Sequence, residues 1–132
     1  MKIVLDCNVL ISAGLINGNC RNVLMEVLHS HTNYVSDDII REFRNVIFRK
    51  KFEPYKLNLV ELLKLTCTLS TWIEKPAPNK EFTLPDIHDQ IYLDLALEVS
   101  AHYIITGNAK DFPLGNYNLV QIITPQKFLQ KI

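Results

Sequence analysis

The segment Lys2-Ile3-Val4-Leu5-Asp6 decides the fold. Its apolar centre contains two β-branched residues, which is typical of a buried β-strand. A carboxylate follows the strand directly at Asp6, a residue type that a hydrophobic core rarely contains. In open parallel sheets, ligands bind beyond the carboxyl ends of the strands. The segment therefore predicts a buried strand that carries Asp6 to the ligand-binding edge of a sheet.

Strand-like and helix-like segments alternate along the rest of the chain. Further strands are expected over residues 33–35, 69–73, 103–106 and 119–123, and helices over residues 20–29, from 37 to a stop at Pro54, over 59–66, over 86–100 and from Pro125 onward. This alternation predicts a parallel sheet with helices on both faces. The proline-rich segment 76–85 is too short to separate two domains, so residues 1–132 are expected to form one domain.

Composition narrows the class of protein. Hydrophobic residues make up 48% of the chain, which predicts a folded domain. No apolar run is long enough to cross a bilayer, and Asp6 interrupts the amino-terminal apolar run, so neither a membrane segment nor a signal peptide is expected. Cys7, Cys20 and Cys67 are too far apart for a zinc knuckle or a redox pair, which favours free thiols in a reducing cytoplasm.

The overall charge carries a weaker argument. Lysine plus arginine and aspartate plus glutamate each number 14, so no global basic field holds nucleic acid. This balance counts mildly against a dedicated nucleic-acid-binding module. It counts less against an enzyme that needs only a local basic rim around an acidic centre.

A second group of polar residues follows the expected strand 103–106. The segment Thr106-Gly107-Asn108-Ala109-Lys110-Asp111-Phe112 places an amide and a carboxylate at the same edge as Asp6. The alternative interpretation is that Asp6 and Asp111 only make hydrogen bonds within turns. For either residue alone, the two interpretations are about equally good.

A third carboxylate lies on a helix. At about 100° per residue, Asp89 falls close to Tyr92 and Ala96 on the apolar face, whereas Asp94 falls on the opposite, solvated side. The competing interpretation makes Asp86 an N-cap and Asp89 its partner in a capping-box-like pair.

Glu42 lies at the border of another apolar stripe, beside Ile39 and Val46. The residues at helical reach include Asp38 and Asn45 but no lysine or arginine, so an ordinary surface salt bridge is not expected. Glu42 is therefore a candidate metal ligand.

Convergence of these carboxylates would require a cation. Clustered carboxylates repel one another and lose hydration, which destabilises the fold unless a positive charge joins them. Oxygen ligands without sulfur favour Mg²⁺ or Mn²⁺. Such ions activate water, neutralise phosphate and stabilise a leaving oxygen, which together serve phosphodiester hydrolysis.

Taken in order, four segments resemble the PIN-domain family, in particular its small prokaryotic branch of VapC-like toxins. They are residues 3–12 with Asp6 and Asn8, residues 36–43 with Glu42, residues 86–96 with Asp86 and Asp89, and residues 106–112 with Asn108 and Asp111. Each motif is weak alone, and the four in order are fairly specific. The resemblance implies an α/β fold with three α/β/α layers around a central, mostly parallel sheet of about five strands.

The resemblance also implies a function and a set of site residues. It implies a Mg²⁺- or Mn²⁺-dependent endoribonuclease, the toxin of a toxin-antitoxin pair, with RNA as substrate and a cognate antitoxin as partner, and it leaves a homodimer open. The implied catalytic residues are Asp6, Glu42, Asp89 and Asp111; the implied metal ligands add Asp86 and Asn108; the implied substrate-binding residues are Asn8, Ser12, Thr106 and Lys110.

Several points stay open at this stage. Many family members have an acid at the position of Asn108. Either Asn108 or Asp111 therefore fills the fourth acidic position of the motif set, and whether one or two metal ions bind stays open. Arg44 and Arg49 are further candidates for phosphate contacts, although basic side chains are usually solvated. The alternative function is a catalytically weak, PIN-like nucleic-acid-binding module without a dedicated antitoxin.

Two other classes of protein fit less well. A receiver-type phosphoacceptor has an acidic pair at the end of its first strand, whereas Cys7 and Asn8 follow Asp6 here. A haloacid-type phosphatase would have an aspartate where this chain has Asn8.

Overall fold

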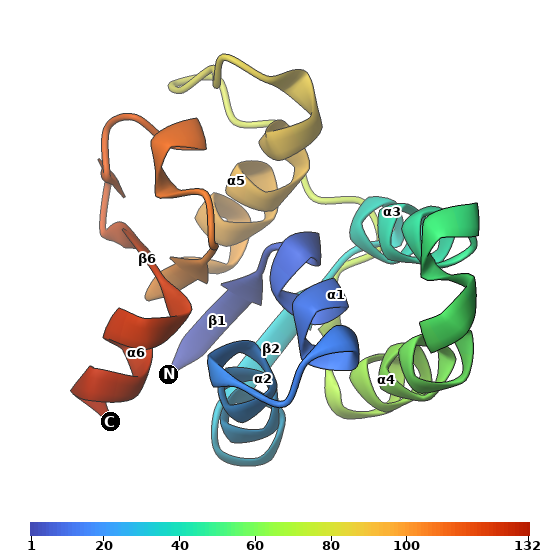
Figure 1. Ribbon diagram of the computed structural model, residues 1–132. Coiled ribbons are helices and arrows are strands. Elements are labelled where there is room, and N and C mark those ends of the chain that lie inside the picture. Colours follow the sequence, from blue (N-terminus) through green and yellow to red (C-terminus); the bar gives the residue numbers. More distant parts are fainter.

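The computed structural model describes residues 1–132 (Figure 1). The strands are β1 (Lys2–Leu5), β2 (Thr32–Val35), β3 (Thr71–Trp72), β4 (Tyr103–Ile105), β5 (Asn116–Tyr117) and β6 (Val120–Ile123). The α-helices are α1 (Cys7–Leu15), α2 (Asn19–Ser30), α3 (Asp37–Ile47), α4 (Lys56–Leu69), α5 (Ile87–Val99) and α6 (Pro125–Lys131). Two 3₁₀ turns, η1 (Lys50–Tyr55) and η2 (Ala109–Asp111), complete the chain. No helix combines the length and the apolar content that crossing a membrane requires.

All strands form one sheet in the order β3-β2-β1-β4-β6-β5, and only the β5–β6 pair is antiparallel. From β1 to β3 the chain moves across the sheet in one direction, and β4 lies on the other side of β1. Right-handed crossovers therefore place α1 to α4 and α5 on opposite faces. Figure 1 shows α1 and α2 on one side of the sheet and α5 on the other. The predicted α/β class, with a mostly parallel sheet between helices, is confirmed, with six strands in place of about five.

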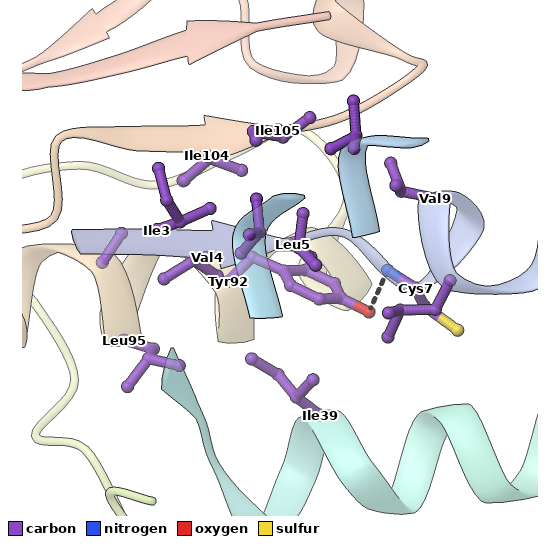
Figure 2. Close-up of a cluster of buried hydrophobic side chains, with 14 of the residues drawn as sticks. Ile3, Val4, Leu5, Cys7, Val9, Ile39, Tyr92, Leu95, Ile104 and Ile105 are labelled. Atoms are coloured by element: carbon purple, nitrogen blue, oxygen red, sulfur yellow. Dashed lines mark hydrogen bonds between the residues drawn. The ribbon is translucent and has the colours of Figure 1, made fainter. Parts of the chain in front are cut away.

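The core around β1 explains why Ile3, Val4 and Leu5, the residues after Lys2, are all apolar. Ile3, Val4 and Leu5 are at most 2% exposed, because helices cover both faces of the sheet. Figure 2 shows these side chains beside Ile104 on the neighbouring strand and Leu95 on α5. A strand buried on both faces has no polar alternation, so Asp6, the first residue after β1, is a polar residue in buried surroundings.

Helix α1 was not anticipated from the sequence. Its residues Val9, Leu10, Ile11 and Ala13 are all buried, because α1 packs against α2, α3 and α4. A helix buried on most sides lacks the apolar stripe that reveals an amphipathic helix.

Other boundaries also differ from the prediction. Helix α4 continues through Leu69, so β3 has two residues, Thr71–Trp72, in place of a strand over 69–73. Helix α3 ends at Ile47, and Pro54 lies inside η1 rather than at a helix stop. Strand β5 was missed because two residues are too few for a periodic pattern.

The fold brings the ends of β1 and β4 together. These adjacent parallel strands lie where the strand order reverses, which is the usual ligand-binding position in such sheets. The backbone nitrogen of Asp6 donates to the carbonyl oxygen of Ile105 at 3.0 Å, so the pairing extends to the first residue after β1. Asp6 and Thr106 therefore face each other across this point.

Candidate functional site

Asp6 is a buried carboxylate held by two hydrogen bonds. It is 5% exposed and is the N-cap of α1. The Thr106 hydroxyl donates to its Oδ2 at 2.7 Å, and the backbone nitrogen of Asn8 donates to its Oδ1 at 3.4 Å. Burial raises the pKa of Asp6, the bonds from Thr106 and Asn8 oppose this rise, and the charge of Asp111 adds to it. Asp6 is therefore fixed in orientation while its negative charge remains uncompensated.

Glu42 is joined to the end of β1 through a tyrosine. The hydroxyl of Tyr92, on α5, donates to Glu42 Oε2 at 3.0 Å and accepts a hydrogen bond from the Cys7 backbone nitrogen at 3.2 Å. Figure 2 shows the Tyr92 ring reaching Cys7 through the core. The Tyr92 side chain thus links α3, α5 and the start of α1 in one chain of hydrogen bonds.

The environment of Glu42 disfavours its charge. Burial raises the pKa of this half-buried carboxyl, and the negative charge of Asp6 adds to the rise. The Tyr92 hydrogen bond and the charges of His88 and Arg49 act in the opposite direction. The same surroundings raise the pKa of the Cys7 thiol to about 12, first through burial and then through Glu42 and Asp6, so Cys7 is an uncharged core residue.

The pKa of Asp89 depends on several neighbouring carboxylates. It is half-buried in the first turn of α5, and its side chain accepts no hydrogen bond. The pKa of Asp89 is raised to about 6, first by burial and then by the charges of Asp111, Asp6, Asp86 and Glu42. Three segments that are distant in sequence, together with the nearby Asp86, therefore act on the charge of one side chain.

The capping interpretation holds for Asp86 only. Asp86 is exposed and is the N-cap of α5, where its carboxylate accepts a hydrogen bond from the His88 backbone nitrogen at 2.9 Å. Asp89 makes no reciprocal side-chain bond, so the pair is not a capping box. Asp86 has an evident structural role, and Asp89 has none.

The segment after β4 contributes Asp111 more directly than Asn108. Asp111 is half-buried at the end of η2, and its charge raises the pKa of both Asp6 and Asp89. Asn108 is exposed, and its side chain makes no hydrogen bond, whereas its backbone nitrogen donates to the Thr106 hydroxyl at 3.0 Å. Lys110 is exposed and forms no ion pair.

Two of the expected substrate-binding side chains do not join the cluster. Asn8 contributes its backbone nitrogen to Asp6, and its side chain is exposed and makes no hydrogen bond. Ser12 lies one turn further along α1 and is half-buried.

The expectation for Asp94 is wrong. It is half-buried rather than solvated, and its Oδ1 accepts three hydrogen bonds, two from Asn79 and one from Gln90. The proline-rich segment folds back onto α5 and covers this side of the helix, which a helical wheel cannot reveal. Asp94 therefore anchors that segment.

The donor chemistry of the cluster suits a hard divalent cation. Asp6, Glu42, Asp89 and Asp111 offer only oxygen, and none of the four forms an ion pair. As the side chains stand, no group of three or more histidine, cysteine, aspartate or glutamate residues is close enough to hold a metal ion. The carboxylates are thus gathered around one region without forming a closed coordination shell.

Comparisons with known proteins agree with this architecture. A family model described as PIN domain matches residues 2–110. Among solved structures, a chain in the crystal structure of VapBC2 from Rickettsia felis bound to a DNA fragment from their promoter has a similar fold, with a TM-score of 0.67 and 17% sequence identity. The alignment covers 94% of this chain and 98% of that chain. No curated protein matches the sequence of this chain.

Proposed function

The chain belongs to the PIN-domain family, and we propose that it is a metal-dependent nuclease that hydrolyses phosphodiester bonds in RNA. The observation that carries this proposal is the set of four carboxylates without a cation. Asp6, Glu42, Asp89 and Asp111 come from four separate segments, lie close enough to act on the pKa of Asp89 or on one another, and form no ion pair. Such an arrangement is unfavourable for stability alone, which supports a functional reason for it.

In this proposal the four carboxylates hold Mg²⁺ or Mn²⁺. The bound cation would supply activation of water, neutralisation of phosphate and stabilisation of the leaving oxygen. Asp111 rather than Asn108 fills the fourth acidic position, because its charge acts on Asp6 and Asp89 while the Asn108 side chain is exposed.

Two uncharged residues would position the acids. Thr106 donates to Asp6 and at the same time accepts from the Asn108 backbone, so its single hydroxyl proton is directed at the carboxylate. Tyr92 fixes Glu42 in the same way from the core. The Tyr92 bond leaves Oε1 of Glu42 available, whereas Oδ1 of Asp6 also accepts the longer bond from the Asn8 backbone nitrogen at 3.4 Å.

The proposal extends to RNA as the substrate and to a partner protein. PIN-domain nucleases with a VapC-like fold are found in toxin-antitoxin systems, and the similar solved chain comes from a VapBC2 complex bound to promoter DNA. By analogy, this chain is the toxin of such a pair, and a small antitoxin neutralises it. A catalytically weak, PIN-like nucleic-acid-binding module without a dedicated antitoxin is the second candidate, because the carboxylates do not form a closed metal site as they stand.

Cleavage of a single-stranded RNA by purified protein separates these candidates. The nuclease proposal expects cleavage in Mn²⁺ or Mg²⁺, none in EDTA, and a loss of about a hundredfold or more for Asp89→Asn. Glu98→Gln is the matched control, because Glu98 is an exposed acid on the same helix that makes no hydrogen bond or ion pair. RNA binding without cleavage in any of these ions would favour the binding module.

A further inference from the structure

A cavity of about 560 Å³ adjoins the carboxylate cluster. One wall comes from α3 and the turn after it, and the other wall comes from the first turns of α5. Its lining includes Arg41, Glu42, Asn45, Arg49, Ile87 and His88. Glu42 belongs to both the cluster and the cavity, so the two spaces are continuous. Binding sites for molecules of nucleotide size fall in this range of volumes.

One arginine that lines the cavity forms no ion pair. Arg41 is committed to Asp38, with 2.8 Å between the guanidinium Nη1 and the carboxylate Oδ1. Arg49 forms no ion pair and no side-chain hydrogen bond, yet its charge acts on Glu42. A guanidinium suits phosphate because its planar fork donates two hydrogen bonds at once. Arg49 therefore offers an anion contact directly beside the acidic centre.

The opposite wall offers an apolar surface. Ile87, at the start of α5, is 78% exposed although its branched side chain is hydrophobic. A single exposed isoleucine is ordinary on a protein surface. Here it lines the same cavity as Arg49, together with half-buried Ile91 and Val46. An apolar side chain facing a cation across a cavity matches a nucleotide, which has a flat base at one end and a phosphate at the other.

We propose that this cavity binds the nucleotide next to the scissile phosphodiester of a single-stranded nucleic acid, with Arg49 on the flanking phosphate and Ile87 against the base. The proposal rests on the proposed nuclease function, since it assigns the cavity to the same substrate. Arg49 would give this chain of zero net charge one contact for a polyanion beside the four carboxylates. The attraction is local rather than spread over the whole surface.

Binding is tested with a fluorescein-labelled, single-stranded RNA of about ten nucleotides, a length that matches common single-strand sites. Fluorescence anisotropy is measured at low salt in EDTA and again in Ca²⁺. Arg49→Gln should weaken binding by about tenfold, as the loss of one charge-assisted contact implies. The slope of log affinity against log salt should fall by about 0.7. Ile87→Ala should weaken binding by about threefold without changing that slope.

The chain supplies a matched control for each variant. Arg44→Gln removes the same charge from an exposed position on α3, the helix that precedes Arg49, but Arg44 lines a separate hollow with Trp72. Ile16→Ala shortens an isoleucine that is 68% exposed and lies outside the cavity. Because all four positions are exposed, the melting temperatures should stay close to that of the wild type.

The outcomes separate the cavity from the nuclease proposal. Weaker binding for Arg49→Gln and Ile87→Ala than for their controls supports the cavity, even if the wild type cleaves no RNA. Equal binding for Arg49→Gln and Arg44→Gln in both conditions overturns the assignment, even if the wild type cleaves RNA in Mn²⁺. Absence of measurable RNA binding by the wild type at low salt also overturns it.

Discussion

Exchange of Asp89 for asparagine should change how the stability of the metal-free protein depends on pH. Folding raises the pKa of Asp89 from its ordinary 3.8 to about 6, because burial and four neighbouring carboxylates disfavour the charged form. Between these two values the folded protein binds more protons than the unfolded protein. The free energy of unfolding therefore falls as pH rises from about 4 to about 6, and levels off above that range.

The magnitude follows from the size of the pKa change. A rise from 3.8 to about 6 corresponds to at most about 3 kcal/mol. Asp89 is only half-buried, so solvent screening reduces this to about 1 kcal/mol. Metal-free Asp89→Asn should be more stable than the parent by about that amount at pH 7. Part of the pH dependence should remain, because folding also raises the pKa values of Asp6 and Glu42.

Urea unfolding in EDTA at several pH values measures this effect, with Glu98→Gln as the control. The decrease in stability between pH 4 and 6 should be smaller for Asp89→Asn than for the parent, and unchanged for Glu98→Gln. Identical pH profiles for the parent and Asp89→Asn would refute the reasoning, since they would mean that the neighbouring carboxylates do not act on Asp89.

Three further substitutions test other parts of the site. Asp6→Asn should leave the metal-free protein at least as stable as the parent in urea melts, because a buried charge is removed. RNA cleavage in Mn²⁺ should fall to background, and a destabilised but active variant would exclude Asp6 from the site. Tyr92→Phe should destabilise the protein by about 1–2 kcal/mol and weaken Mn²⁺ binding, because the Cys7 nitrogen and Glu42 both lose a hydrogen-bond partner. Unchanged Mn²⁺ affinity would limit Tyr92 to a structural role. Asp94→Asn should destabilise the protein by about 1 kcal/mol in urea melts but should not reduce RNA cleavage, because the hydrogen bonds of Asp94 hold a loop rather than the carboxylate cluster. A large loss of cleavage with intact stability would contradict this structural role.

The sequence predicted two kinds of element: those that are buried on one face, and short apolar segments that are buried completely. Strands β1 and β4 are apolar runs that end at Asp6 and Thr106, so their position and the polar edge they form could be foreseen. Helix α1 could not, because its burial on most sides removes the periodic signal. The short β5 depends on pairing with β6, which local sequence does not determine.

The sequence predicted the charged residues of the candidate site but not the hydrogen-bonding residues that hold them. The lack of a basic partner at helical reach of Glu42 agrees with the absence of an ion pair in the structure. The Tyr92 hydroxyl that holds Glu42 lies 50 residues away and looked like an ordinary core aromatic. Its position three residues after Asp89, on the same helical face, was the only signal in the sequence. Asp94 was misplaced because the loop that covers it is also distant in sequence.

Calorimetric titration of the purified protein with Mn²⁺ tests most directly whether the carboxylates form a cation site. We expect the wild type to bind Mn²⁺, and Asp6→Asn and Asp89→Asn each to weaken binding by about tenfold or more, because each removes a charged oxygen ligand. Glu98→Gln should bind as the wild type does. No binding by the wild type, or equal affinity for all four proteins, would contradict the account.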